Sequence, residues 1–164
     1  MNAISLDDGS VTALPKTLAA IVADGPPPLT QSEIDGIYAV GVELYGRELW
    51  SEAQDVFRLL VLVRPTYARG WIALAACHEA QGEEERASSL FLVASCATSR
   101  PDARLAQLYR ARLFAKTGRH DDAREILETL EIEDDDDSAF VTIHAQLSRC
   151  LVDTQPSLQT VGVR

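Results

Sequence analysis

The sequence predicts an all-α protein built as a solenoid of three helix-turn-helix repeats, and two observations lead to this fold class. Alanine, leucine, glutamate and arginine are plentiful and runs of β-branched residues are few, so helix is favoured along the chain. A small residue also recurs four positions ahead of a large apolar one, at intervals of 34 and 36 residues, in Ala53 and Phe57, Ala87 and Phe91, and Ala123 and Leu127. Repetition at such a period indicates stacked copies of one supersecondary unit.

A second helical stretch with its own periodicity precedes each of these segments. The first two read Ile37-x2-Val40-Gly41-x2-Leu44 and Trp71-x2-Leu74-Ala75-x2-His78. Glycines are expected to form the turn between the two helices of each unit, at Gly46, Gly82 and Gly118. Pro65 and Pro101 are expected to follow the second helix, which proline cannot continue. This order matches the tetratricopeptide repeat, a helix hairpin of about 34 residues.

Small residues at matching positions are expected to let the two helices of a repeat pack closely. These positions are Gly41, Ala75 and Ala111 in the first helices, and Ala53, Ala87 and Ala123 in the second helices. Trp71 and Phe91 would then fill the space between neighbouring repeats. The third repeat is the most divergent, because it has Gln107 where the second has tryptophan and carries two extra residues near 98–103.

The predicted domain organisation follows the repeats along the chain. Residues 1–29 form an N-terminal arm with a helix beginning near Leu14, and this arm is a possible dimerisation region. Residues 30–133 hold the three repeats, at about 34–65, 68–101 and 104–131, and Thr30 with Glu33 forms a capping box at their start. Residues 134–152 form an acidic linker and a C-terminal capping helix, and 153–164 form a flexible tail. The capping helix would cover the last apolar surface with Phe140, Ile143, Leu147 and Leu151.

Charge and composition exclude several classes of partner. The chain has 164 residues, enough for one domain or a short repeat array, and a formal net charge of -10. Much of this charge falls in the run EIEDDDD at 131–137, which is expected to be a solvated linker. A negative surface repels phosphate backbones and anionic lipids, so we expect no nucleic-acid partner. The longest apolar run, LLVLV, is too short to cross a bilayer, so no membrane insertion is expected.

The cysteines and the first residues favour a cytoplasmic protein. The chain has an odd number of cysteines, Cys77, Cys96 and Cys150, and no two of them form a CxxC motif. This fits a reducing cytosol better than a disulfide framework. The opening MNAISLDDGS lacks both the basic region and the apolar region of a signal peptide.

The sequence contains no recognisable catalytic motif. The histidines His78, His120 and His144 show no HExxH or HxxxH spacing, and Cys77 and His78 are neighbours that point in different directions on a helix. His78 is expected to occupy the aromatic position of its repeat instead. Neither GxSxG nor a glycine-rich phosphate loop occurs. We therefore expect a binding module that is not an enzyme and holds no cofactor and no metal.

The concave face of the solenoid is the candidate binding site, because the first helix of each stacked pair lines it. The repeat register places twelve residues there: Asp35, Tyr38, Val42 and Tyr45, then Arg69, Ile72, Ala76 and Glu79, then Leu105, Leu108, Arg112 and Lys116. This mostly apolar and aromatic surface suits an extended peptide with spaced apolar anchors. The N-terminal arm of the same chain is the alternative occupant. A clamp for a C-terminal carboxylate is disfavoured, because Val42, Ile72 and Ala76 stand where polar groups would be needed.

Two segments resemble a known family. IYAVGVELYGRELWSEAQDVFRLLVL at 37–62 and WIALAACHEAQG at 71–82 look like the class II chaperones of bacterial type III secretion, the CesD/SycD/LcrH family. The shared features are the spacing of Tyr38 and Tyr45, the EAQDVF and LAAC segments, and three repeats behind an N-terminal helix. The resemblance covers about residues 14–131. The sequence departs from the family pattern in its third repeat and its acidic insertion.

The resemblance implies a cytosolic chaperone of a Gram-negative bacterium. Such a chaperone keeps secreted translocator proteins soluble before export by binding an extended translocator segment in its concave groove, and it is often a homodimer. Tyr38 and Tyr45 would be groove residues, and Ile72 and Ala76 would continue that wall. The alternatives are a chaperone for another secretion component such as a needle subunit, an unrelated tetratricopeptide adaptor, and an enzyme.

Overall fold

The computed structural model describes residues 29–97, 99–134 and 136–153, so the N-terminal arm with its expected helix and the tail from 154 lie outside the described residues. Within these ranges the chain forms seven α-helices and no strand. The helices are α2 (Gln31–Gly46), α3 (Trp50–Val63), α4 (Ala68–Ala80), α5 (Glu84–Ser95), α6 (Arg100–Lys116), α7 (His120–Thr129) and α8 (Ser138–Asp153).

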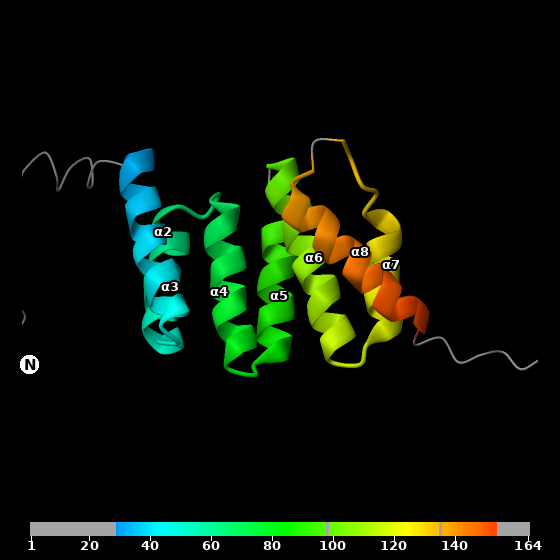
Figure 1. Cartoon of the computed structure of the whole chain (residues 1–164). Coiled ribbons are helices and arrows are strands. Elements are labelled where there is room, and N and C mark those ends of the chain that lie inside the picture. The colour runs from blue at the N-terminus through cyan, green and yellow to red at the C-terminus, as the bar shows by residue number, and fades with distance from the viewer. Residues whose placement is uncertain (1–28, 98, 135, 154–164) are drawn as a thin grey trace, which may run out of the picture.

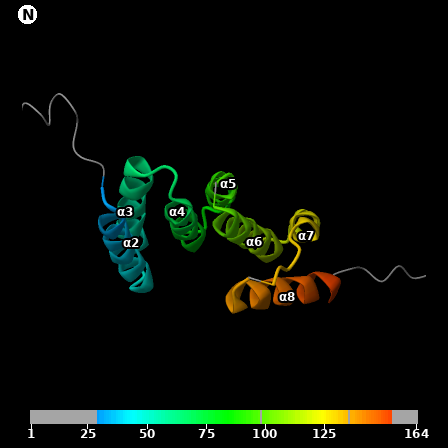
Figure 2. The same ribbon diagram turned by 90° about the horizontal axis from the view of Figure 1, so that it is seen from above.

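The helices follow one another as three antiparallel pairs and a final crossing helix (Figure 1). Helices α2 and α3, α4 and α5, and α6 and α7 form the pairs, and each pair packs on the next. Helix α8 turns away from this direction and lies across α6 and α7, as the view from above makes clear (Figure 2). The predicted all-α solenoid of three tetratricopeptide-type hairpins with a C-terminal capping helix is therefore confirmed.

Three buried clusters run through the stack, and each is shared between neighbouring helices. The first includes Ile34, Phe57 and Leu60, and Leu74 of the next pair also belongs to it. The second joins α4, α5 and α6 around Phe91. The third joins α6 and α7 to α8 and contains Phe140, Leu147 and Leu151, the face predicted for the capping helix, with Ile143 packed against it. Each helix pair thus relies on its neighbour to bury its apolar surface, as expected of a repeat array.

The predicted capping box begins α2. The Thr30 hydroxyl accepts a hydrogen bond from the Glu33 backbone N–H at 3.3 Å, and the Glu33 carboxylate accepts one from the Thr30 backbone N–H at 2.7 Å. Two of the backbone donors that a helix start leaves without partners are satisfied in this way. The backbone and side-chain hydrogen bonds from Thr30 lower the pKa of Glu33. The stabilisation that ionised Glu33 gives to the folded state is therefore present above the unfolded-state pKa of Glu33. It is lost as the pH falls through the lowered pKa of the folded state.

We expect Thr30→Ala to lower the free energy of unfolding by about 1 kcal/mol, because the Glu33 backbone donor loses its acceptor. Urea denaturation followed by circular dichroism measures this change. Thr30→Ser keeps the hydroxyl and is the matched control, which should stay close to the parent. Equal midpoints for Thr30→Ala and the parent would show that the box does not stabilise the fold.

Close packing within the first pair depends on Gly41. A Cβ atom at this position would lie 2.5 Å from Cε1 of Phe57, whose ring is 1% exposed. The matching small residues of the other helices are fully buried: Ala53, Ala75, Ala87, Ala111 and Ala123. The predicted role of these small residues, to bring the paired helices into close contact, is therefore confirmed.

Gly41→Ala tests this packing against a control on the same helix. Alanine raises helix propensity by about 1 kcal/mol, but overpacking a closed core costs about 1 to 3 kcal/mol. We expect a net loss of about 1 kcal/mol for Gly41→Ala, since the buried Phe57 ring has to move. A Cβ at Gly36 meets no atom within 4 Å, so Gly36→Ala should instead stabilise the protein. Stabilisation by both variants in denaturant titrations would contradict the close packing.

The turns follow the prediction in two units and differ in the first. Gly82 and Gly118 adopt left-handed conformations with φ of 76° and 80°, which glycine tolerates without strain. In the first unit Gly46 is the last residue of α2, and Glu48 takes the left-handed conformation with φ of 61°. Pro65 follows α3 and Pro101 follows α5, as predicted, and Pro101 also lies in the first turn of the next helix, α6. Proline is well tolerated there, because the backbone N–H groups of the first turn make no hydrogen bond within the helix and the N–H that proline lacks is not needed.

Candidate functional site

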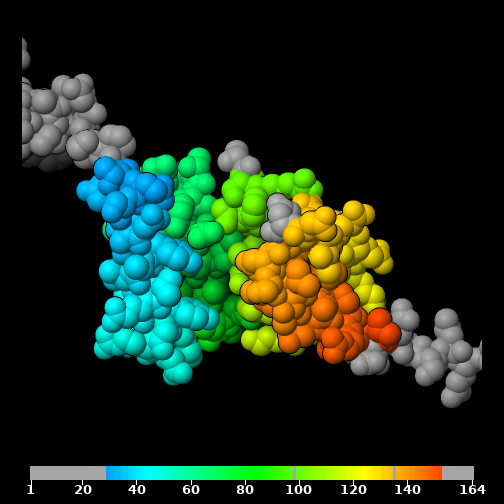
Figure 3. Space-filling model, turned by 45° about the horizontal axis from the view of Figure 1, so that its top comes forward, coloured from blue at the N-terminus to red at the C-terminus, as the bar shows by residue number. Residues whose placement is uncertain are grey.

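A hollow opens on the concave face between the first helices of the three pairs. Its volume is about 270 Å³, and it is lined by Tyr38, Val42 and Tyr45 of α2, Ile72, Ala73 and Ala76 of α4, Tyr109 and Arg112 of α6, and Phe57 and Phe91 from below. The space-filling view shows the surface dropping to α4 between α2 and the α6–α8 side (Figure 3). The stacking of the repeats therefore builds this site, because no single hairpin supplies all of its walls.

Tyrosines give the hollow its character. Tyr38 lies 5.8 Å, between ring centroids, from both Phe57 and Tyr67, so its ring is held by packing. Burial raises the pKa of the Tyr38 and Tyr45 hydroxyls above the ordinary tyrosine value, so both stay neutral at physiological pH. Tyr109 closes the opposite side and packs against Phe91 at 6.0 Å. Rigid aromatic walls that end in hydroxyls suit a peptide, because the rings bury apolar side chains and the hydroxyls can meet backbone groups.

One end of the hollow carries a three-membered ion cluster. Glu79 of α4, whose side chain is 10% exposed, accepts hydrogen bonds from Arg112 at 3.0 Å and from Lys116 at 3.3 Å, both on α6. The Arg112 guanidinium also lies 4.8 Å from the centre of the Tyr109 ring. The cluster ties the second pair to the third and fixes Arg112 at the edge of the apolar surface.

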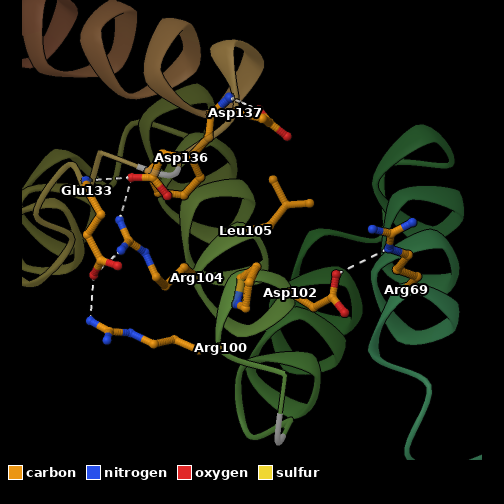
Figure 4. Close-up of a pocket in the computed structure, with 10 residues that line it drawn as sticks. Arg69, Arg100, Asp102, Arg104, Leu105, Glu133, Asp136 and Asp137 are labelled. Carbon is orange, nitrogen blue, oxygen red and sulfur yellow. Dashed lines mark hydrogen bonds and ion pairs between the residues drawn. The ribbon is translucent and has the colours of Figure 1, made fainter.

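A second, polar compartment of about 370 Å³ lies between the starts of α4, α6 and α8. Arg69 reaches across from α4 and donates a hydrogen bond to Asp102 of α6 at 3.2 Å (Figure 4). Leu105 lines this compartment, together with Phe140 of α8. Two residues predicted for the groove, Arg69 and Leu105, therefore belong to this compartment and not to the apolar hollow.

Glu133, Asp136 and Asp137 of the acidic run line this compartment, so the expectation of a solvated linker is wrong for these residues. Arg104, whose side chain is 11% exposed, forms ion pairs with Glu133 and, at 2.8 Å, with Asp136, and it lies 5.0 Å from the Phe140 ring centre. Arg100 pairs with Glu133 as well (Figure 4). Asp137 accepts a hydrogen bond from the Phe140 backbone N–H at 2.7 Å and so caps α8. These contacts hold Glu133, Asp136 and the start of α8 against α6.

Six of the predicted groove residues line the hollow: Tyr38, Val42, Tyr45, Ile72, Ala76 and Arg112. Leu108 does not, because it is 0% exposed in the cluster that also contains Phe140 and Leu147 of α8, so its predicted surface position is wrong. Its neighbour Tyr109 faces the hollow instead. Asp35 is exposed and accepts a hydrogen bond from Gln31 on its own helix, outside both spaces. Asp35 lines neither the apolar hollow nor the polar compartment, so its predicted place in the groove is not supported.

The described part of the chain shows no metal site, and its buried histidine has structural partners. No group of three or more histidine, cysteine, aspartate or glutamate side chains is placed to hold a metal ion among these residues. His78 is buried, with its ring nitrogens 2.9 and 3.1 Å from the Gln54 amide nitrogen and one of them 2.5 Å from Glu83. It thus has structural partners on α3 and at the start of α5. None of the described helices combines the length and the apolar character that a membrane span needs.

Comparisons with known proteins agree with this architecture. A sequence profile of the tetratricopeptide repeat matches residues 90–147. No curated protein sequence matches the chain. Among solved structures, the Yersinia enterocolitica type III secretion chaperone SycD in complex with a peptide of the translocator YopD superimposes with a TM-score of 0.65 at 16% identity, over 76% of this chain and 93% of that one.

The chaperone PcrH gives the same result. PcrH from Pseudomonas aeruginosa matches with a TM-score of 0.65 at 20% identity, over 76% of this chain and 93% of that chain. PcrH in complex with the chaperone-binding region of PopD matches with a TM-score of 0.60 at 20% identity, over 76% and 92% of the two chains. At these identities the likeness establishes the fold: the chain folds as the type III secretion translocator chaperones do.

Proposed function

We propose that this protein is a chaperone that binds an extended segment of a secreted translocator protein in its concave hollow before type III export. The observation that carries the proposal is a preformed apolar hollow with tyrosine walls on a fold shared with chaperones solved in complex with translocator peptides. The resemblance of residues 37–62 and 71–82 to class II chaperones supports the same function. The site residues would be those that line the hollow.

The physical logic rests on the chemistry of the client. A protein destined for a membrane carries apolar segments that aggregate in water. A disordered client can lay apolar side chains into a preformed groove, and their burial offsets the loss of conformational freedom. A chaperone of this kind needs a rigid hollow and no reacting groups, so we infer a binding protein and not an enzyme. The net charge of -10 would help to keep the complex in solution.

Co-expression with a translocator from the same bacterium tests the proposal. We expect a soluble complex that survives gel filtration, whereas the translocator alone should aggregate. Identifying by mass spectrometry what copurifies with the chaperone from native cytosol would name the client. If no translocator copurifies and co-expression leaves the translocator insoluble, the proposed function is wrong.

The likeness to chaperones in complex with translocator peptides favours this function over a chaperone for a needle subunit, which would hold a helical client. Circular dichroism of the bound peptide separates the two, because the translocator function requires an extended segment. We further propose a cytoplasmic location, as expected for a partner that acts before export.

We also propose a homodimer formed through the N-terminal arm, residues 1–29, because its segment LPKTLAAIVA at 14–23 is mostly apolar. Sedimentation at micromolar concentration tests it, since a monomeric mass would contradict the dimer.

A further inference from the structure

The charges around the hollow are not symmetric. Beyond the hollow, in the polar compartment near the start of α4, Arg69 and Asp102 form a pair of one cation and one carboxylate. At the opposite end, Arg112 and Lys116 share the single carboxylate of Glu79. Within the described residues no second carboxylate forms an ion pair with either of these two cations. One positive charge is therefore left over at this end, although the chain as a whole is acidic.

The surplus charge faces outward. The Glu79 side chain is 10% exposed, whereas Arg112 is 41% and Lys116 63% exposed, so the carboxylate lies beneath its two partners. A chain lying in the hollow would meet the cations first. Lys116 contributes no surface to the apolar hollow, but Arg112 does, and its contact with the Tyr109 ring holds it at the boundary.

The positive end also reaches the wall formed by α2. Burial is the main cause of the raised pKa of Tyr45. The charges of Glu79 and Arg112 also act on this pKa, in opposite directions. The Tyr45 hydroxyl is thus within electrostatic range of the cluster. An apolar side chain seated between Tyr45, Ile72 and Tyr109 would have its neighbour on one side beside Arg112 and Lys116.

We infer that the client segment carries an acidic side chain on one side of its apolar anchor, and that Arg112 and Lys116 bind this carboxylate. The inference rests on the proposed function and specifies the chemistry of the segment. The pair would also set the direction in which the segment lies, because the cation on the other side, Arg69, is already paired with Asp102. Partly exposed ion pairs are weak, so the carboxylate supplies selectivity and direction more than affinity.

Short peptides test the inference. Their ends are acetylated and amidated, so that no terminal carboxylate can bind in place of a side-chain carboxylate. The parent peptide has leucine anchors in a serine-alanine frame, and glutamate or glutamine is placed in turn at each position on either side of the anchors. We expect glutamate to bind about threefold more tightly than glutamine, as for an exposed ion pair, and on one side only. The ratio should approach one in about 1 M salt, where the screening length falls to about 3 Å.

Charge variants locate the effect. Lys116→Gln should remove most of the preference, and Lys116→Glu should reverse it, so that a peptide with lysine at that position binds better than one with glutamate. Arg69→Gln should keep the preference, because the carboxylate binds at the other end. Arg86→Gln, an exposed cation that pairs with Glu83 on another face, is the control for net charge.

The outcomes separate the inference from the proposed function. If the neutral parent peptide binds and glutamate brings no gain in affinity on either side, the inference is wrong, but binding of a peptide in the hollow remains supported. A gain that persists in Lys116→Glu also overturns the inference, because the carboxylate then binds elsewhere. If no peptide binds at all, both proposals fail.

Discussion

Replacing both Tyr38 and Tyr45 by alanine is expected to weaken client binding by about 2 to 4 kcal/mol, which corresponds to roughly a thirtyfold to a thousandfold rise in Kd. The two rings form the α2 wall of the hollow, and their removal leaves the anchor of the client partly exposed to water. Isothermal titration calorimetry with the copurifying client segment measures the loss. Binding as tight as that of the parent would mean that the hollow is not the binding site.

Stability has to be separated from binding in this variant. Tyr38 packs on Phe57 and Tyr67, so its truncation also costs folding free energy. The variant with phenylalanine at both positions keeps the rings and should retain most of the affinity. Val40→Ala removes an exposed apolar side chain of the same helix outside the hollow and should leave binding unchanged. Thermal unfolding of each variant shows whether the protein tested is still folded.

Arg104→Ala is expected to release the segment 131–137 and the start of α8. The substitution removes the shared partner of Glu133 and Asp136 and the contact with the Phe140 ring. Removing one member of a buried ion pair leaves uncompensated charge, and with Glu133 partly exposed we expect a loss of about 2 to 3 kcal/mol. Hydrogen exchange should rise in 131–141 and stay unchanged in α2 and α3.

Arg100→Gln is the matched control for Arg104. Arg100 also pairs with Glu133, but its side chain is 76% exposed, so the loss should stay below about 1 kcal/mol. Equal effects of the two substitutions would contradict the structural role assigned to Arg104. An unchanged exchange rate in 131–141 for Arg104→Ala would show that the acidic run does not depend on this contact.

The repeat register accounts for what the sequence could predict. Small residues such as Gly41 and Ala53 recur at fixed distances, because every hairpin has to meet the same packing requirement. The same register brought six residues to the hollow, since side chains at equal positions of stacked hairpins lie on one face. Thr30 and Glu33 identified the start of α2, because a capping box is a local pattern of sequence.

Contacts between distant segments account for what the sequence could not predict. Leu108 has the register position of Ile72, but the cluster it shares with α8 buries it fully, and the register contains no information on where a crossing helix lies. The ion pairs of Arg104 with Glu133 and Asp136 join residues about thirty positions apart. No local pattern in the acidic run indicates these pairs, so the sequence alone predicts a solvated linker. Tyr109 could have been found from its aromatic side chain next to Leu108, once α8 was known to cover that leucine.

Site-specific photo-crosslinking tests the central claim most directly, that stacked hairpins hold another chain in their concave hollow. A benzophenone amino acid is placed at Val42, which lines the hollow, or at Val40, which is exposed on the same helix outside it. In cells that make the client, we expect a crosslinked chaperone–client product from position 42 and none from position 40. Crosslinking from position 40 with none from position 42 would contradict the account.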